Sequence, residues 1–177
     1  MTELKTALAI LASGIGFGLL FMVAFVGGTK WAADADGAVA LWAMLAVSPL
    51  VHELAHRTVF RRMCVKAELA APLHHVLGFG GAVRVPEGVP KHVMATGALA
   101  GPLATLSQAV LSLALSPVFK PLSLAALLLA SSVVASGLPF TTDGKHLTNP
   151  MRLALVASGL ALSVASLFTA AYLLKYG

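Results

Sequence analysis

Residues 46–62 have the sequence AVSPLVHELAHRTVFRR, which places His52, Glu53 and His56 inside an otherwise apolar segment. Apolar residues dominate positions 38–63, and this run exceeds the roughly twenty residues that a bilayer-spanning helix needs. On a helix, positions i and i+4 lie above one another on one face, so both imidazoles can reach one metal ion. Ionisable side chains within a membrane span are costly and rare. The stretch therefore predicts a membrane helix that supplies two metal ligands.

Glu53 lies between the two histidines, in the order His-Glu-x-x-His. Zinc lowers the pKa of a bound water to roughly 7, and a neighbouring carboxylate can accept its proton and pass it to a leaving amine. We predict Zn²⁺ as the cofactor, His52 and His56 as ligands, and Glu53 as the general base. Catalytic zinc usually has three protein ligands, so a third must come from elsewhere. The alternative is a chance match in which both histidines are hydrogen-bonded core residues.

The composition is that of an integral membrane protein. Of the 177 residues, 58% are hydrophobic and 11% are charged, whereas soluble domains average about 45–50% apolar and about 25% charged residues. The net charge of +5 comes from basic residues scattered at the ends of apolar segments, where they report orientation and contact with lipid head groups. The lipid bilayer is therefore an expected partner, and nucleic acid is not.

Five apolar segments predict an all-α polytopic membrane protein that forms one domain over residues 1–177, with its core in 38–150. The expected spans lie near residues 4–26, 38–63, 92–115, 122–138 and 152–173. The first could instead be a cleaved signal peptide, but its apolar run is longer than a typical signal core. Between the second and third spans, the glycine-rich residues 78–85 (GFGGAVRV) predict a short membrane-associated β-hairpin.

The distribution of basic residues predicts the orientation of the chain. If the N-terminus is cytoplasmic, only Lys30, Lys120 and Lys175 face outward and the other nine of the 12 Lys and Arg residues face inward. We therefore expect a multi-pass protein of the cell membrane with a cytoplasmic N-terminus. In this arrangement the exits of the second and fourth spans lie on the same side of the bilayer, so the fourth span can supply the missing ligand.

The segment after the fourth span contains the candidates for that ligand. Pro139 and Gly144 bracket Asp143, a pattern that predicts an unwound helix end lining a polar site. A carboxylate at the mouth of an apolar span is costly unless a cation offsets that cost, which favours Asp143. His146 lies three residues further along, and His74 and His75 in the glycine-rich segment are more distant alternatives.

These residues resemble the site-2 protease family of intramembrane zinc metalloproteases. The H-E-x-x-H motif of that family is matched in full, and Gly101-Pro102 matches part of its G-P-x-x-N motif, with Thr105 in place of the Asn. Pro139 and Asp143-Gly144 resemble its N-x-x-P and L-D-G elements, with Ser136 in place of the Asn. The resemblance covers roughly residues 40–150, with the motifs in the family's order.

The resemblance implies a zinc endopeptidase that cleaves membrane-embedded segments of other proteins, as in regulated intramembrane proteolysis. It implies Asp143 as the third zinc ligand. It also implies contacts with the substrate by Gly80, Gly81, Thr105 and Ser136. The expected partners are a transmembrane protein substrate and the bilayer, together with an accessory membrane protein or a second copy of the chain.

Two other functions remain open from the sequence. The departures at Thr105 and Ser136 are compatible with a catalytically silent membrane scaffold of the same fold. A zinc-binding transporter would also place His and Glu in apolar helices, but the companion acids expected on neighbouring spans are missing, and Arg57 directly follows His56.

Overall fold

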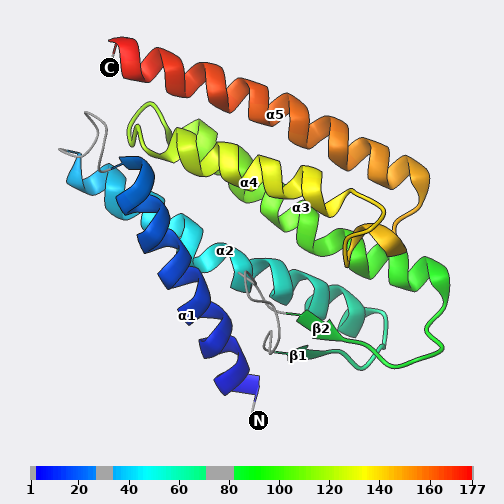
Figure 1. Cartoon of the computed structure of the whole chain (residues 1–177). Helices are drawn as coiled ribbons and strands as arrows, with labels where there is room; N and C mark the ends of the chain where they lie inside the picture. Colours follow the sequence, from blue (N-terminus) through cyan, green and yellow to red (C-terminus); the bar gives the residue numbers. More distant parts are fainter. Residues whose placement is uncertain (1–2, 27–33, 71–81, 177) are drawn as a thin grey trace.

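The computed structural model describes residues 3–26, 34–70 and 82–176, which form an all-α bundle with one small hairpin (Figure 1). The five α-helices of these residues are α1 (Glu3–Phe21), α2 (Ala35–Arg62), α3 (Lys91–Leu115), α4 (Leu122–Ser136) and α5 (Asn149–Tyr176). A π-helical turn, η1 (Met22–Val26), continues α1, and a 3₁₀ turn, η3 (Gly144–His146), lies between α4 and α5. The predicted fold class is confirmed, and the helices begin and end within a few residues of the expected spans.

The hairpin lies between α2 and α3, as predicted, although its first strand precedes the glycine-rich residues 78–85 from which it was predicted. Strands β1 (Glu68–Ala70) and β2 (Ala82–Arg84) pair in antiparallel register, with Leu69 opposite Val83. The residues that join the two strands are outside the described part of the chain. The predicted substrate contacts Gly80 and Gly81, and the alternative ligands His74 and His75, fall among them.

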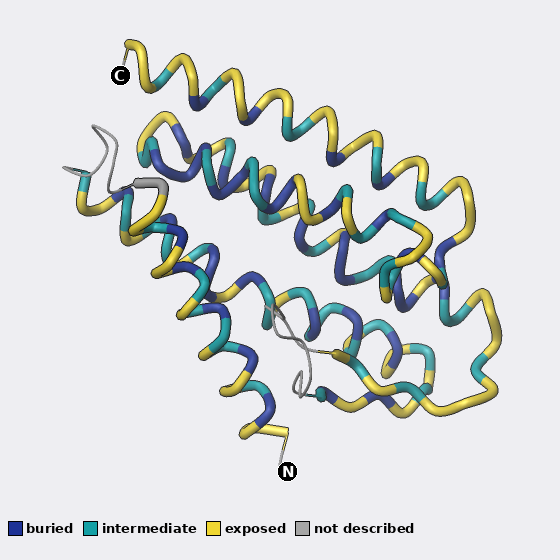
Figure 2. Tube along the Cα trace, in the orientation of Figure 1, coloured by how far each residue is buried: buried dark blue, intermediate teal, exposed yellow. Residues whose placement is uncertain are grey.

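Four of the described helices are long and apolar enough to cross a membrane, namely α1, α2, α3 and α5. Their outward faces carry large apolar side chains such as Leu153 and Phe168, which are 72% and 71% exposed. Figure 2 shows the exposed positions of α5 along its outer side. Apolar side chains on the outside of a bundle suit contact with lipid, so the chain has the features of a multi-pass membrane protein.

Helix α4 is different, because it is short and central. Its 15 residues span roughly 22 Å, less than the roughly 30 Å of a bilayer's hydrocarbon core. Ala125, Ala126 and Val133 are fully buried, since α3 and α5 both pack against this helix. Because this short helix ends at Ser136, the segment that follows can approach the interior of the bundle.

Helix α1 packs along α2 with the opposite direction. Near the middle of the crossing, a Cβ at Gly14 would overlap the backbone of Ala46, so the glycine permits the close approach. At the far end, the Glu3 carboxylate pairs with Arg57 and with Arg61, 2.9 Å away. The N-terminus of α1 and the C-terminal end of α2 therefore lie at the same end of the bundle.

Candidate metal centre

His52 and His56 of α2 meet Asp143, which directly precedes η3. The two Nε2 atoms are 3.0 Å apart. Asp143 Oδ2 lies 3.3 Å from the Nε2 of His52, and Asp143 Oδ1 lies 3.3 Å from the Nε2 of His56. Within the described residues, this is the group of His, Cys, Asp or Glu side chains whose ligand atoms come close enough to hold a metal ion. The structure thus brings together the three predicted ligands.

The spacing of these atoms fits a zinc-sized ion. In a tetrahedral site with metal–nitrogen distances of about 2.0–2.1 Å, two ligand atoms lie roughly 3.3–3.4 Å apart. The Nε2–Nε2 distance of 3.0 Å and the distance of 3.3 Å from each Nε2 to its nearer Asp143 oxygen differ from this by a few tenths of an ångström. The two imidazoles face different oxygens of the carboxylate, and one ligand atom from each of the three residues lies within 4.8 Å of the others. Two imidazoles and one carboxylate are also a donor set that zinc accepts, with a fourth position left for water or substrate.

A hydrogen bond from the outer nitrogen of His56 fixes its tautomer. Nδ1 lies 2.7 Å from the carbonyl oxygen of Gly97, which can only accept, so Nδ1 carries the proton. The Gly101 amide lies 3.4 Å from the same Nδ1, but this longer approach would require Nδ1 to accept. We therefore assign the proton from the shorter contact. The lone pair of Nε2 is then free to bind a metal ion.

His52 is held in the same way by Thr105. The Nδ1 of His52 lies 2.9 Å from Thr105 Oγ1, and that hydroxyl donates to the Gly101 carbonyl at 3.2 Å. Since the hydroxyl has one proton, it must accept from Nδ1–H of His52. Both Nε2 lone pairs therefore face Asp143. Two nitrogen lone pairs and a carboxylate at this separation repel one another unless a cation lies among them, which is the electrostatic reason to assign a possible cation site here.

Glycine at position 101 lets α3 lie against the two histidines. A Cβ added there would overlap the Nε2 atoms of both His52 and His56. A Cβ at Gly97 would overlap the ring of Phe60. Gly97, Gly101 and Thr105 follow one another at intervals of four residues, so they line the single face of α3 that meets α2.

Asp143 is placed by a tight turn after α4. The Thr141 hydroxyl donates to the Leu138 carbonyl at 2.8 Å and accepts from the Gly144 amide at 3.1 Å. Gly144 is also so close to the Leu138 carbonyl that a Cβ would overlap it. An aspartate carboxyl ordinarily ionises well below pH 7, so the Asp143 side chain presents carboxylate oxygens to the two Nε2 lone pairs. Asp143 can therefore serve as an anionic metal ligand near neutral pH.

The other predicted site residues have different positions. Glu53 is 8% exposed and lies on α2 beside the ligands, and its role as general base stays a prediction. His146 lies on η3 outside the three-residue group. Ser136 ends α4, and its carbonyl accepts from Thr141. Contacts of Thr105 and Ser136 with a substrate also stay predictions.

Comparison with protein-family models, with curated proteins and with solved structures finds no match. The chemistry proposed for this centre therefore depends on its geometry and on the motifs in the sequence.

Replacing Thr105 by valine is expected to weaken zinc binding about 10- to 100-fold, the range typical of losing a hydrogen-bond partner of a metal ligand. Valine keeps the shape of Thr105 but cannot accept the Nδ1 proton of His52, so the ring loses its fixed orientation. The measurement is competition for zinc against a chelator of known affinity. Ser107→Ala is the matched control, because Ser107 is an exposed hydroxyl on the same helix that bonds to the Leu103 carbonyl of its own helix. Equal affinity in wild type and Thr105→Val would show that the hydroxyl does not orient the ligand.

Proposed function

We propose that this protein is an intramembrane zinc endopeptidase that cleaves membrane-embedded segments of other proteins. The observation that supports this most is the His52–His56–Asp143 group, with both Nε2 lone pairs directed inward, in a bundle of apolar membrane-length helices. The adjacent Glu53 completes the set of groups that peptide hydrolysis by a zinc enzyme requires. The same residues carry the resemblance to the site-2 proteases.

The position of the centre along α2 favours a substrate inside the bilayer. His56 and His52 precede the last residue of α2, Arg62, by 6 and 10 residues, which corresponds to roughly 9 and 15 Å along the helix axis. Arg61 and Arg62 mark the end of this helix. Since basic residues favour the head-group region, the ligands lie below the membrane face. A peptide bond cleaved at this depth belongs to a membrane-embedded segment.

Each residue has a defined task in the proposed reaction. A zinc ion held by His52, His56 and Asp143 would supply a Lewis acid and lower the pKa of a water molecule. Glu53 accepts a proton from the attacking water and passes it to the amine released when the peptide C–N bond breaks. Gly97 and Thr105 hold the imidazoles in the required tautomer. The β1–β2 hairpin offers strand edges with which an unwound substrate can pair.

The alternative functions receive less support. A transporter needs further coordinating groups along a path, and the described residues contain no second group of this kind. Thr105 replaces the Asn of the family motif, which alone is compatible with a silent scaffold. Its hydroxyl bonds to His52, however, which supports a role for Thr105 in holding a metal ligand. The cytoplasmic N-terminus, the cell membrane as location and an accessory protein or second copy stay predictions.

The experiment that tests this function combines metal analysis with proteolysis. Purified protein in lipid nanodiscs is expected to contain close to one zinc ion per chain and to cleave a synthetic transmembrane peptide. A chelator should abolish cleavage, and added zinc should restore it. Cleavage that persists after the metal has been removed, or a protein that binds no zinc, would contradict the proposal.

A further inference from the structure

A second polar contact joins α2 and α3 beyond the metal centre. The Ser48 hydroxyl donates to the Gln108 side-chain carbonyl at 3.1 Å. Ser48 precedes His52 by four residues and Gln108 follows Thr105 by three, so this pair repeats the His52–Thr105 contact one turn deeper. Along the seam between α2 and α3, the polar pairs are His56–Gly97, His52–Thr105 and Ser48–Gln108.

This third pair lies deep in the bundle. Ser48 precedes Arg62 by 14 residues, which is roughly 21 Å along the axis and about 6 Å beyond His52. Polar side chains at such a depth are costly unless their hydrogen-bonding groups are satisfied, because lipid offers no partners. Gln108 at this depth therefore needs hydrogen-bond partners for its side-chain carbonyl and N–H groups.

The hydrogen bonds of Gln108 are incomplete. Its side chain has one carbonyl and two N–H donors. The carbonyl accepts from Ser48, and within residues 3–26, 34–70 and 82–176 no acceptor bonds to the side-chain nitrogen. If the oxygen and nitrogen exchange places, Ser48 accepts one N–H and the other still lacks an acceptor. Gln108 is half-buried, so this donor can be reached by a ligand.

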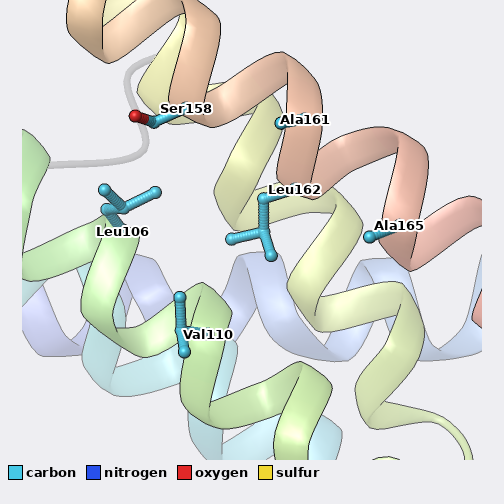
Figure 3. Close-up of a pocket in the computed structure, with 6 residues that line it drawn as sticks. All are labelled: Leu106, Val110, Ser158, Ala161, Leu162 and Ala165. Atoms are coloured by element: carbon cyan, nitrogen blue, oxygen red, sulfur yellow. The ribbon is translucent and has the colours of Figure 1, made fainter.

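The opposite side of α3 has a different character. There, α3 and α5 enclose a crevice of about 370 Å³ (Figure 3). Its lining consists of Leu106, Val110, Ser158, Ala161, Leu162 and Ala165. This lining is almost entirely apolar and suits hydrocarbon, whereas a ligand with exposed peptide groups is better matched by the polar seam with α2.

We propose that the Gln108 side-chain amide donates a hydrogen bond to a main-chain carbonyl of the substrate, about two residues from the scissile bond. This inference rests on the proposed endopeptidase function. An unwound segment in the bilayer exposes carbonyl groups that no water can satisfy, and the donor of Gln108 complements them. The offset follows from geometry, since an extended chain advances about 3.3 Å per residue and Ser48, which bonds to Gln108, lies about 6 Å beyond His52 along α2. Ser48 orients the amide.

The first test compares Gln108→Met with wild type. Methionine is also unbranched and of similar length, but it offers no N–H donor. With a fluorogenic transmembrane peptide in nanodiscs, we expect kcat/KM to fall about tenfold while the zinc content is unchanged. Ser107→Ala, on the adjacent position of α3, is expected to match wild type. A value of kcat/KM for Gln108→Met equal to that of wild type would overturn the proposal.

The second test locates the bond on the substrate. A series of peptides carries a single ester in place of one amide at each position flanking the cut, because an ester carbonyl is a weaker acceptor. Wild type is expected to be slowed by an ester at one position about two residues from the cut, and Gln108→Met is expected to be insensitive at that position. A merely structural role for Gln108 predicts the same ester profile in both proteins and would overturn the proposal. If wild type cleaves no peptide at all, the endopeptidase function itself is wrong, whereas cleavage with matching profiles removes only the role of Gln108.

Discussion

Replacement of Glu53 by glutamine is expected to abolish peptide hydrolysis and to leave close to one zinc ion bound per chain. Glutamine has nearly the same size and still fits a position that is 8% exposed. Its amide cannot accept a proton from water. Residue 53 can then neither assist the attack of water on the peptide carbonyl nor deliver a proton to the leaving amine. Removal of a general acid–base typically lowers the rate by about 10²- to 10⁴-fold.

The experiment measures zinc content and the release of product from a transmembrane peptide with the same purified samples. Glu87→Gln provides the matched control, because Glu87 is an exposed acid in the turn between β2 and α3. Full activity in Glu53→Gln would exclude Glu53 as the base and would leave the proposed mechanism without a proton acceptor. Loss of zinc together with activity would instead assign a structural or ligating role to Glu53.

The predictions that the structure confirmed came from physical rules that act strongly on a membrane chain. A bilayer-spanning segment must satisfy its own backbone hydrogen bonds, so long apolar runs predict helices well. The spacing of His52 and His56 placed them on one face of α2. The expected alternation of spans placed the end of the fourth apolar segment on the same side as these ligands, which made Asp143 a candidate ligand, and in the structure Asp143 lies beside both histidines.

Other parts of the centre carry little signal in the sequence. The partner of His56 is the backbone carbonyl of Gly97, an atom that every residue has. The Thr105 hydroxyl accepts from His52 and donates to the Gly101 carbonyl. In the sequence, Thr105 was noted only as a departure from the Asn of the G-P-x-x-N motif, which did not indicate these two bonds. The sequence contains the i+4 spacing from Gly97 through Gly101 to Thr105, but this spacing alone does not show which helix that face of α3 meets.

The length of α4 also differs from the apolar run that predicted it. Apolar residues continue to Leu138, but the helix ends at Ser136. Gly137 follows at the C-cap, and the Thr141 hydroxyl bonds to the carbonyls of Ser136 and Leu138, replacing the helical pattern with a turn. Hydropathy averaged over a window of residues does not detect such a turn. The early end of α4 is what allows Asp143 to reach the two histidines.

Replacement of Asp143 by asparagine is expected to weaken zinc binding by more than the roughly 10- to 100-fold that is typical of losing an outer hydrogen-bond partner. The substitution removes the anionic ligand and leaves a neutral amide oxygen, which is not among the usual ligands of zinc. Cleavage should be lost with the metal. Zinc affinity is measured by chelator competition, and activity with the transmembrane peptide at saturating zinc separates weak binding from defective chemistry.

The matched comparison is His146→Ala, because His146 is the other candidate ligand on the same segment and lies only three residues from Asp143. Its position on η3 is outside the three-residue group, and burial together with the nearby Lys145 lowers the pKa of its imidazole, so it is neutral near pH 7. Removing a neutral side chain that contributes no ligand is expected to leave zinc affinity and cleavage close to wild type. If His146→Ala loses the metal and Asp143→Asn retains it, the centre is a three-histidine site. The segment after α4 must then shift by about one 3₁₀ turn, so that the His146 imidazole takes the position that Asp143 occupies here.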